Sequence, residues 1–243
     1  MRKLFIFLGL VFCIDMTYAQ LDTSLILSKN LSRTVQTYTY KAGKVQAHSS
    51  IVYFTDGHKL IEAGFWKEID RLTAQGKIPP AYYVFVSSLD PDNPATDFRE
   101  EYFFCNQNYL DFFAQELIPT IEDKLGVRFL AKNRGLVGVS FGGLNAAYFS
   151  AKSKDLFQNY ALLSPITYPG KKLMQHIAFS SNQNLRIFLS TGKLDAENYL
   201  VPLQQMYQSK GYTLAVLNTG GDHSFDNWRQ QLEAVLTFVA RPH

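Results

Sequence analysis

The sequence is poor in several features that mark large protein classes. Its 243 residues contain two cysteines, no long run of like charges, and a formal net charge of only +3. A nucleic-acid-binding protein would show a basic stripe, so we expect no nucleic acid among its partners. Apart from the first residues, no segment is long and apolar enough to cross a bilayer, which takes about 20 residues.

Motifs for metals and nucleotides are also missing. The chain has no H-x-x-x-H, C-x-x-C or Asp-rich loop, and no G-x-G-x-x-G follows an expected strand. The glycine-rich stretch 135–143 lacks the Lys-Ser/Thr of a phosphate-binding loop. We therefore expect neither a metal nor a nucleotide cofactor.

The first 19 residues have the pattern of a signal peptide. Met1-Arg2-Lys3 is a short positive region, residues 4–14 are apolar, and Thr17-Tyr18-Ala19 places small residues before a cleavage site. We expect cleavage after Ala19 and an exported protein, periplasmic or secreted, with one domain over 20–243. An uncleaved anchor is the alternative. Cleavage removes Cys13 and leaves Cys105 alone, which favours a packed thiol over a disulfide or a nucleophile.

Short apolar runs alternate with amphipathic segments along the rest of the chain. The expected strands are 34–40, 51–54, 82–86, 136–139, 160–163, 185–190 and 213–217, and the expected helices are 61–72, 110–125, 144–150, 199–208 and 226–239. This alternation predicts an α/β fold with a mostly parallel sheet and helices on both faces. The irregular stretch 87–108 is rich in aromatic residues and is expected to be either a cleft wall or a loop held by packing.

A nucleophile motif stands between an expected strand and an expected helix. Gly138-Val139-Ser140-Phe141-Gly142 is a G-x-S-x-G, which has chemical meaning only in that context. A serine hydroxyl is a weak nucleophile, and a sharp strand-to-helix turn exposes it. The amide of Phe141 then points to the oxyanion that develops, aided by the helix N-terminus. A glycine-rich turn without catalytic function is the alternative.

A serine nucleophile needs a base and an orienting carboxylate. In hydrolases of this fold the order is Ser, acid, His. Among the five histidines only His223 lies between the last expected strand and the last expected helix, because His243 is the terminal residue. Asp195 follows the strand 185–190 and a short turn, and it is the favoured acid, with Glu197 as its nearest rival. A turn histidine or a helix cap is the other interpretation of His223. The second oxyanion amide is expected from Gly57 or His58, after the strand 51–54, although Asp56 and these residues also suit a simple turn.

Several segments together resemble the family of esterases that includes esterase D, feruloyl esterases, ferric-enterobactin esterases and mycolyltransferase antigens. The likeness covers most of the mature chain, and the matching segments are 52–57, 99–102, 113–121, 138–143, 191–195 and 220–229. The resemblance implies an α/β-hydrolase fold with little or no lid, a Ser140–Asp195–His223 triad, and oxyanion amides from Phe141 and the Gly57–His58 turn.

The same resemblance implies a carboxylic ester hydrolase that forms an acyl-enzyme on Ser140. The ester would be of a siderophore or of a carbohydrate or feruloyl type. Candidate substrate contacts are Arg99, Tyr102, Tyr168 and Trp228, while Arg99 is equally suited to a buried ion pair. An acyltransferase on the same triad, or a non-catalytic binding protein with this fold, stays open.

Overall fold

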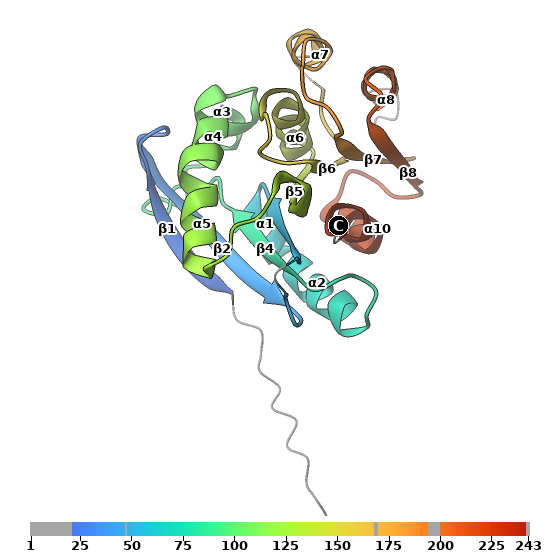
Figure 1. Cartoon of the computed structure of the whole chain (residues 1–243). Helices are drawn as coiled ribbons and strands as arrows, with labels where there is room; N and C mark the ends of the chain where they lie inside the picture. The colour runs from blue at the N-terminus through green and yellow to red at the C-terminus, as the bar shows by residue number, and fades with distance from the viewer. Residues whose placement is uncertain (1–20, 47, 168–169, 194–199, 242–243) are drawn as a thin grey trace, which may run out of the picture.

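A computed structural model describes residues 21–46, 48–167, 170–193 and 200–241. These residues form one eight-stranded sheet with helices on both faces (Figure 1). The expected signal peptide lies outside the described residues. Among the described residues, no helix has the length and apolar character needed to cross a membrane.

The sheet is parallel except at one side. Its spatial order is β1-β2-β4-β3-β5-β6-β7-β8, and the two pairings β1–β2 and β2–β4 are antiparallel. The strands are β1 (Asp22–Ser28), β2 (Arg33–Ala42), β3 (Ser50–Phe54), β4 (Ala81–Val86), β5 (Arg134–Val139), β6 (Asn159–Leu163), β7 (Arg186–Gly192) and β8 (Thr213–Thr219). Because β3 to β8 all run the same way, their carboxyl ends and the loops after them share one edge.

Two apolar layers hold the helices against the sheet. On one face lie α1 (Gly57–Glu62), α2 (Phe65–Ala74), α9 (Phe225–Gln230) and α10 (Leu232–Val239). On the other lie α3 (Arg99–Phe103), α4 (Gln107–Phe112), η1 (Phe113–Leu117), α5 (Ile118–Leu125), α6 (Phe141–Lys152), α7 (Gly170–Ala178) and α8 (Leu200–Ser209), as Figure 1 shows. A short η2 (Ala131–Asn133) precedes β5. The expected α/β architecture is confirmed.

The structure adds elements that the sequence pattern did not predict. Strand β1 covers the edge of β2, although its sequence DTSLILS carries no strict alternation toward a core. The stretch 87–108 contains α3, and burial of Tyr102 and Phe103 shows that packing holds it.

Three expected helices are interrupted. Helix 61–72 divides at Gly64, whose φ of 78° ends α1 and begins α2. Helix 110–125 becomes α4, a π-helical turn and α5, because Pro119 has no N–H to donate and its ring crowds the carbonyl four residues earlier. Helix 226–239 divides at Gln231 into α9 and α10.

Candidate active site

Ser140 stands at the sharp turn between β5 and α6. Its backbone has φ 57° and ψ −118°, a strained conformation for a non-glycine residue. The turn needs close approach of strand and helix: a Cβ on Gly138 would lie 2.0 Å from the carbonyl oxygen of Gly142. The Ser140 N–H donates to the carbonyl of Leu163 at 2.9 Å, which ties the turn to β6. The serine is therefore held in the conformation that G-x-S-x-G predicts.

The structure brings His223 to Ser140. His223 Nε2 and Ser140 Oγ lie 2.9 Å apart, within hydrogen-bonding distance, although the residues are 83 positions apart in the chain. His223 stands in the loop between β8 and α9, at the same sheet edge as the end of β5. On its other side, the Trp228 ring meets the imidazole edge-on with centroids 4.9 Å apart.

The expected acid and one aromatic residue lie outside the described residues. These are Asp195, its rival Glu197, and Tyr168. Nearby, β7 ends at Gly192, and Lys193 N–H donates to the Thr219 carbonyl at 2.9 Å. The end of β7 is thus joined to the start of the loop that carries His223.

Two helix N-termini flank the serine. Helix α6 begins at Phe141, and α1 begins at Gly57 after Asp56, whose backbone is left-handed with φ 57°. The first N–H groups of a helix have no partner within that helix, so they are available to an anion. A hydrogen bond of 3.1 Å from Thr55 N–H to the Val137 carbonyl joins the turn before α1 to β5.

Arg99 pairs with Asp56 beneath this turn. Arg99 Nε donates to Asp56 Oδ1 at 2.5 Å and Nη2 donates to Oδ2 at 2.9 Å. Nη2 also donates to the carbonyl of Val139 at 3.4 Å, and the guanidinium stacks 5.0 Å from the centroid of Phe141. Burial raises the pKa of the Asp56 carboxyl, and the hydrogen bonds from Arg99 oppose that rise. Of the two roles expected for Arg99, the buried ion pair is the one that these contacts form.

His58 lies in the first turn of α1. Its Nδ1 is 3.2 Å from Ser87 Oγ, and its Nε2 is buried without a hydrogen-bond partner among the described residues. Burial lowers the pKa of His58 to about 4, with the positive charges of Lys59 and Arg99 acting in the same direction. The ring is therefore neutral near pH 7.

Burial corrects the expected substrate contacts at Tyr102 and Trp228. Tyr102 is 1% exposed and stacks on Tyr109 with centroids 4.6 Å apart. Trp228 is 3% exposed, and its Nε1 donates to Ser164 Oγ at 2.9 Å. Neither ring offers surface to a ligand in this conformation. The sequence shows that these residues are aromatic, but it does not show which way a ring faces.

Cys105 is buried, and burial raises the pKa of its thiol. Its expected role as a packed thiol agrees with this placement. Ser164 was not predicted, because its partner Trp228 lies 64 positions away in the chain. Asn227 was not predicted either: its partners are near in sequence, but the loop shape that brings them together leaves no sequence pattern. Among the described residues, no three His, Cys, Asp or Glu side chains are grouped to hold a metal.

The arrangement has the parts of an acyl-transfer site. A hydroxyl on a strained turn meets an imidazole, and the helix that follows the serine begins at the next residue. Such geometry allows proton removal from the serine and stabilisation of negative charge on a substrate oxygen.

The family profile and the similar proteins all point to esterases. The profile of the family described as "Putative esterase" matches residues 28–239. An endo-1,4-beta-xylanase/feruloyl esterase of Xylanibacter ruminicola is 25% identical over 166 residues, 68% of this chain and 22% of that protein. An iron(III) enterobactin esterase of Escherichia coli O6:H1 is 26% identical over 139 residues, 57% of this chain and 32% of that protein.

The fold also matches solved structures. The enterochelin esterase of Shigella flexneri superposes with a TM-score of 0.78 at 21% identity, covering 89% of this chain and 57% of that one. The matched region spans a third or less of the length of the curated relatives. Since the family profile extends from β1 to the last turn of α10, the chain belongs to the Putative esterase family.

Proposed function

We propose that the chain is a serine esterase that hydrolyses a carboxylic ester through an acyl-enzyme on Ser140. The observation that carries the proposal is the 2.9 Å approach of His223 Nε2 to Ser140 Oγ at a strained strand-to-helix turn. Membership of the esterase family supports it independently.

The mechanism follows from the placement of these groups. His223 removes the Ser140 proton as Oγ attacks the ester carbonyl, and the oxyanion is stabilised by the amides of Phe141 and of Gly57 or His58. Each such donor is typically worth about 3 kcal/mol in the transition state. His223 then protonates the departing alcohol, and water, activated by the same imidazole, releases the acid. Asp195, or Glu197 in its place, would orient the imidazole.

Substitution of the two central residues tests the proposal. Ser140→Ala and His223→Ala should each reduce hydrolysis of p-nitrophenyl acetate by at least about 10³-fold, as loss of a triad member does elsewhere. His48→Ala, at an exposed histidine outside the site, is the matched control and should retain activity. Circular dichroism confirms folding of each variant. Unchanged turnover in Ser140→Ala would refute the mechanism.

The names of the relatives suggest two classes of natural ester. One relative is named for feruloyl esters and another for the siderophore enterobactin. We propose that this chain acts on an ester of one of these classes. Rates on a panel of feruloyl, acetylated-glucan and tri-catecholate esters, each compared with Ser140→Ala, decide between them. Adding acceptor alcohols to the panel reveals an acyltransferase, because a new ester then replaces the free acid among the products.

We also propose export with removal of residues 1–19. The positive start, the apolar stretch and the small residues before position 20 support it. N-terminal sequencing of the protein made in a bacterial host should give Gln20 as the first residue. A chain that still begins at Met1 in the cell membrane would favour the uncleaved anchor.

A further inference from the structure

We infer that Asn227 is a positioning residue for the catalytic base, an inference that depends on the proposed esterase function. Asn227 lies in α9, four positions after His223, and is 6% exposed. It does not contact Ser140 in any hydrogen bond of the described residues. Its side chain instead fastens the loop from which His223 projects.

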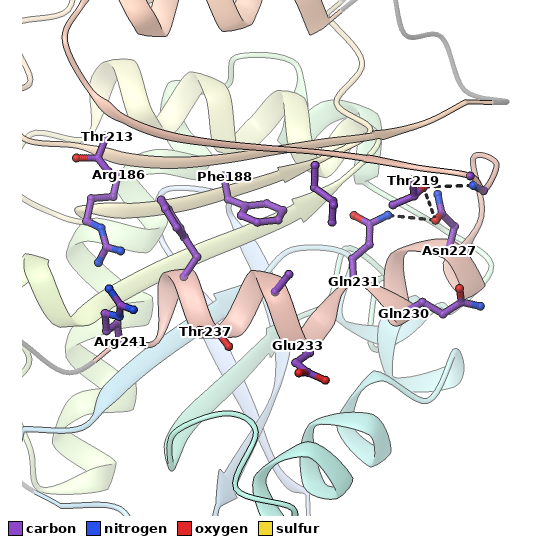
Figure 2. A pocket seen from close by; sticks show the side chains of 15 residues that line it. Arg186, Phe188, Thr213, Thr219, Asn227, Gln230, Gln231, Glu233, Thr237 and Arg241 are labelled. Carbon is purple, nitrogen blue, oxygen red and sulfur yellow. Dashed lines mark hydrogen bonds between the residues drawn. The ribbon is translucent and has the colours of Figure 1, made fainter.

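Three hydrogen bonds fix the Asn227 amide. Nδ2 donates to the main-chain carbonyl of Asp222 at 2.7 Å, the residue directly before His223. Oδ1 accepts from Thr219 Oγ1 at 2.8 Å and from Gln231 Nε2 at 3.2 Å. Figure 2 shows the last two bonds converging on Asn227 from the end of β8 and from Gln231, at the junction of α9 and α10. The two donors at Oδ1 orient the amide so that its own donor faces the histidine loop.

The loop is shaped around this side chain. A Cβ on Gly221 would lie 2.5 Å from Cγ and Oδ1 of Asn227, so only glycine permits the main chain to pass so close. Gly221 N–H donates to Thr219 Oγ1 at 3.3 Å, which adds a second bond from the network to the loop. Contacts with one buried amide thus help to set the path from β8 to His223.

Part of the space beside the loop is open. A groove of about 1060 Å³ lies between α10 and the β7–β8 face, and Thr219, Asn227 and Gln231 form one end of its wall (Figure 2). His223 itself is solvent-exposed. Where side chains do not fill the space beside a loop, hydrogen bonds contribute more to its position. A displacement of about 1 Å in a catalytic group can cost on the order of 10²-fold in rate.

Asn227→Asp tests this role with little change in volume. The carboxylate keeps both acceptor contacts, to Thr219 and Gln231, but places an acceptor against the Asp222 carbonyl. An acidic residue in the first turn of α9 also suits the helix dipole, so the fold should tolerate it. Asn218→Asp adds the same charge at an exposed position of β8 and is the matched control.

The expected result is a split between kinetic constants. Asn227→Asp should lower kcat about 10- to 100-fold with KM within about threefold, because the base is displaced while substrate contacts stay. Labelling of Ser140 by a fluorophosphonate should slow in parallel, and Asn218→Asp should match the wild type. A merely structural role would instead reduce the folded fraction and leave kcat per folded active site unchanged.

Each other outcome has a defined meaning. If wild type hydrolyses esters and Asn227→Asp keeps kcat within about twofold, the positioning role is overturned and the esterase proposal stands. If wild type itself has no turnover, the proposed function fails first. If Asn227→Asp does not fold, Asn227→Ser, which also lacks the amide donor, replaces it. Full kcat in folded Asn227→Ser, or failure of both variants to fold, would overturn the inference.

Discussion

At the scale of single residues, the Asp56–Arg99 pair joins the turn before α1 to the end of β5. Arg99→Met removes the cation from a carboxyl that is fully buried, and losing one partner of a buried pair typically costs about 3–5 kcal/mol. We expect a loss of that order in the free energy of unfolding in urea. We also expect lower kcat, because Asp56 directly precedes the proposed oxyanion amides.

The double variant Asp56→Asn/Arg99→Met is the control, since it removes both charges and should recover part of the lost stability. If Arg99 binds substrate instead, Arg99→Met would raise KM and leave the free energy of unfolding nearly unchanged. That pattern would contradict the structural role.

His58 predicts a pH dependence of stability. Burial lowers its pKa from 6.5 to about 4 in the folded protein. His58 of the unfolded chain is therefore protonated as pH falls through about 6.5, whereas His58 of the folded chain is protonated only near pH 4. The unfolded state therefore gains stability relative to the folded state as pH falls through this window. Above pH 6.5 the effect is absent.

His58→Asn checks this prediction, because Asn retains an acceptor for Ser87 Oγ and does not titrate. The free energy of unfolding of the variant should fall less than that of wild type between pH 6.5 and pH 4. Parallel curves for the two proteins would show that His58 is not responsible. Since the proposed oxyanion donor at this position is a backbone amide, the variant should keep most of its esterase activity.

Also at the scale of residues, the sequence was sufficient to predict those that a local motif or the order of elements marks. G-x-S-x-G between strand and helix indicated Ser140, and the order of elements indicated His223; the structure places the two in contact. Contacts made through distant partners left no such pattern. Arg99 meets Asp56 across 43 positions, so its pairing partner was not predicted.

At the scale of elements, the strands were predicted best and the breaks between helices worst. Strands β2 to β8 are each a short run of apolar or alternating residues, which sequence periodicity detects directly. Helix breaks depend on single backbone positions. The left-handed Gly64 and the effect of Pro119 on η1 change the path of a helix without changing its apolar pattern.

Strand β1 was not predicted, because its strand conformation depends on its contacts with β2 and η1 and not on an alternating pattern of its own residues. Glu116 in η1 holds the β1–β2 turn: its carboxylate accepts from Ser28 Oγ at 2.5 Å and from Lys29 N–H at 2.9 Å. The edge strand is thus fastened to a helix by a charged acceptor. Such a contact becomes visible only when the fold is known.

Glu116→Ala should therefore loosen this edge. Loss of hydrogen bonds to a charged group costs about 1.5–3 kcal/mol when they are shielded from water, and we expect the lower end because Glu116 is only half-buried. Faster hydrogen exchange at Lys29 and Asn30 would report the local opening. Glu100→Ala, at an exposed site in α3, is the control. Equal exchange in both variants would show that Glu116 does not hold the turn.

Although burial opposes the shift, the hydrogen bonds from Ser28 and Lys29 lower the pKa of Glu116 below its ordinary value. The stabilisation is therefore present above the ordinary glutamate pKa and lost as pH falls through the lowered one. The difference between wild type and Glu116→Ala should vanish in acid.

At the scale of the whole molecule, the sheet explains why the site forms where it does. The carboxyl ends of β3, β5 and β8 meet at one edge, so turns far apart in the sequence place Ser140, His223 and the start of α1, with the proposed Gly57 amide, at that edge. The parallel order was predictable from alternating strands and helices. The loop shapes that bring the side chains into contact were not, since they depend on hydrogen bonds such as those of Asn227.

The two cysteines allow one experiment to test both the packing of the fold and the removal of residues 1–19. The full sequence has two cysteines, and removal of residues 1–19 leaves only Cys105, which is buried in the layer against α6. Because burial raises the pKa of its thiol, little reactive thiolate is present at neutral pH. The folded protein, if residues 1–19 are removed as proposed, should therefore react slowly with a thiol reagent such as DTNB.

After unfolding in guanidinium chloride under reducing conditions and removal of the reductant, the protein purified from the expressing host should release about one equivalent of the chromophore per chain, because unfolding exposes Cys105. Two equivalents would mean that Cys13 remains and that the leader is not removed. Rapid reaction of the folded protein would mean that Cys105 is accessible and that the aromatic layer around it opens. The two readings separate cleavage from packing, since the first depends on covalent structure alone and the second on the folded state.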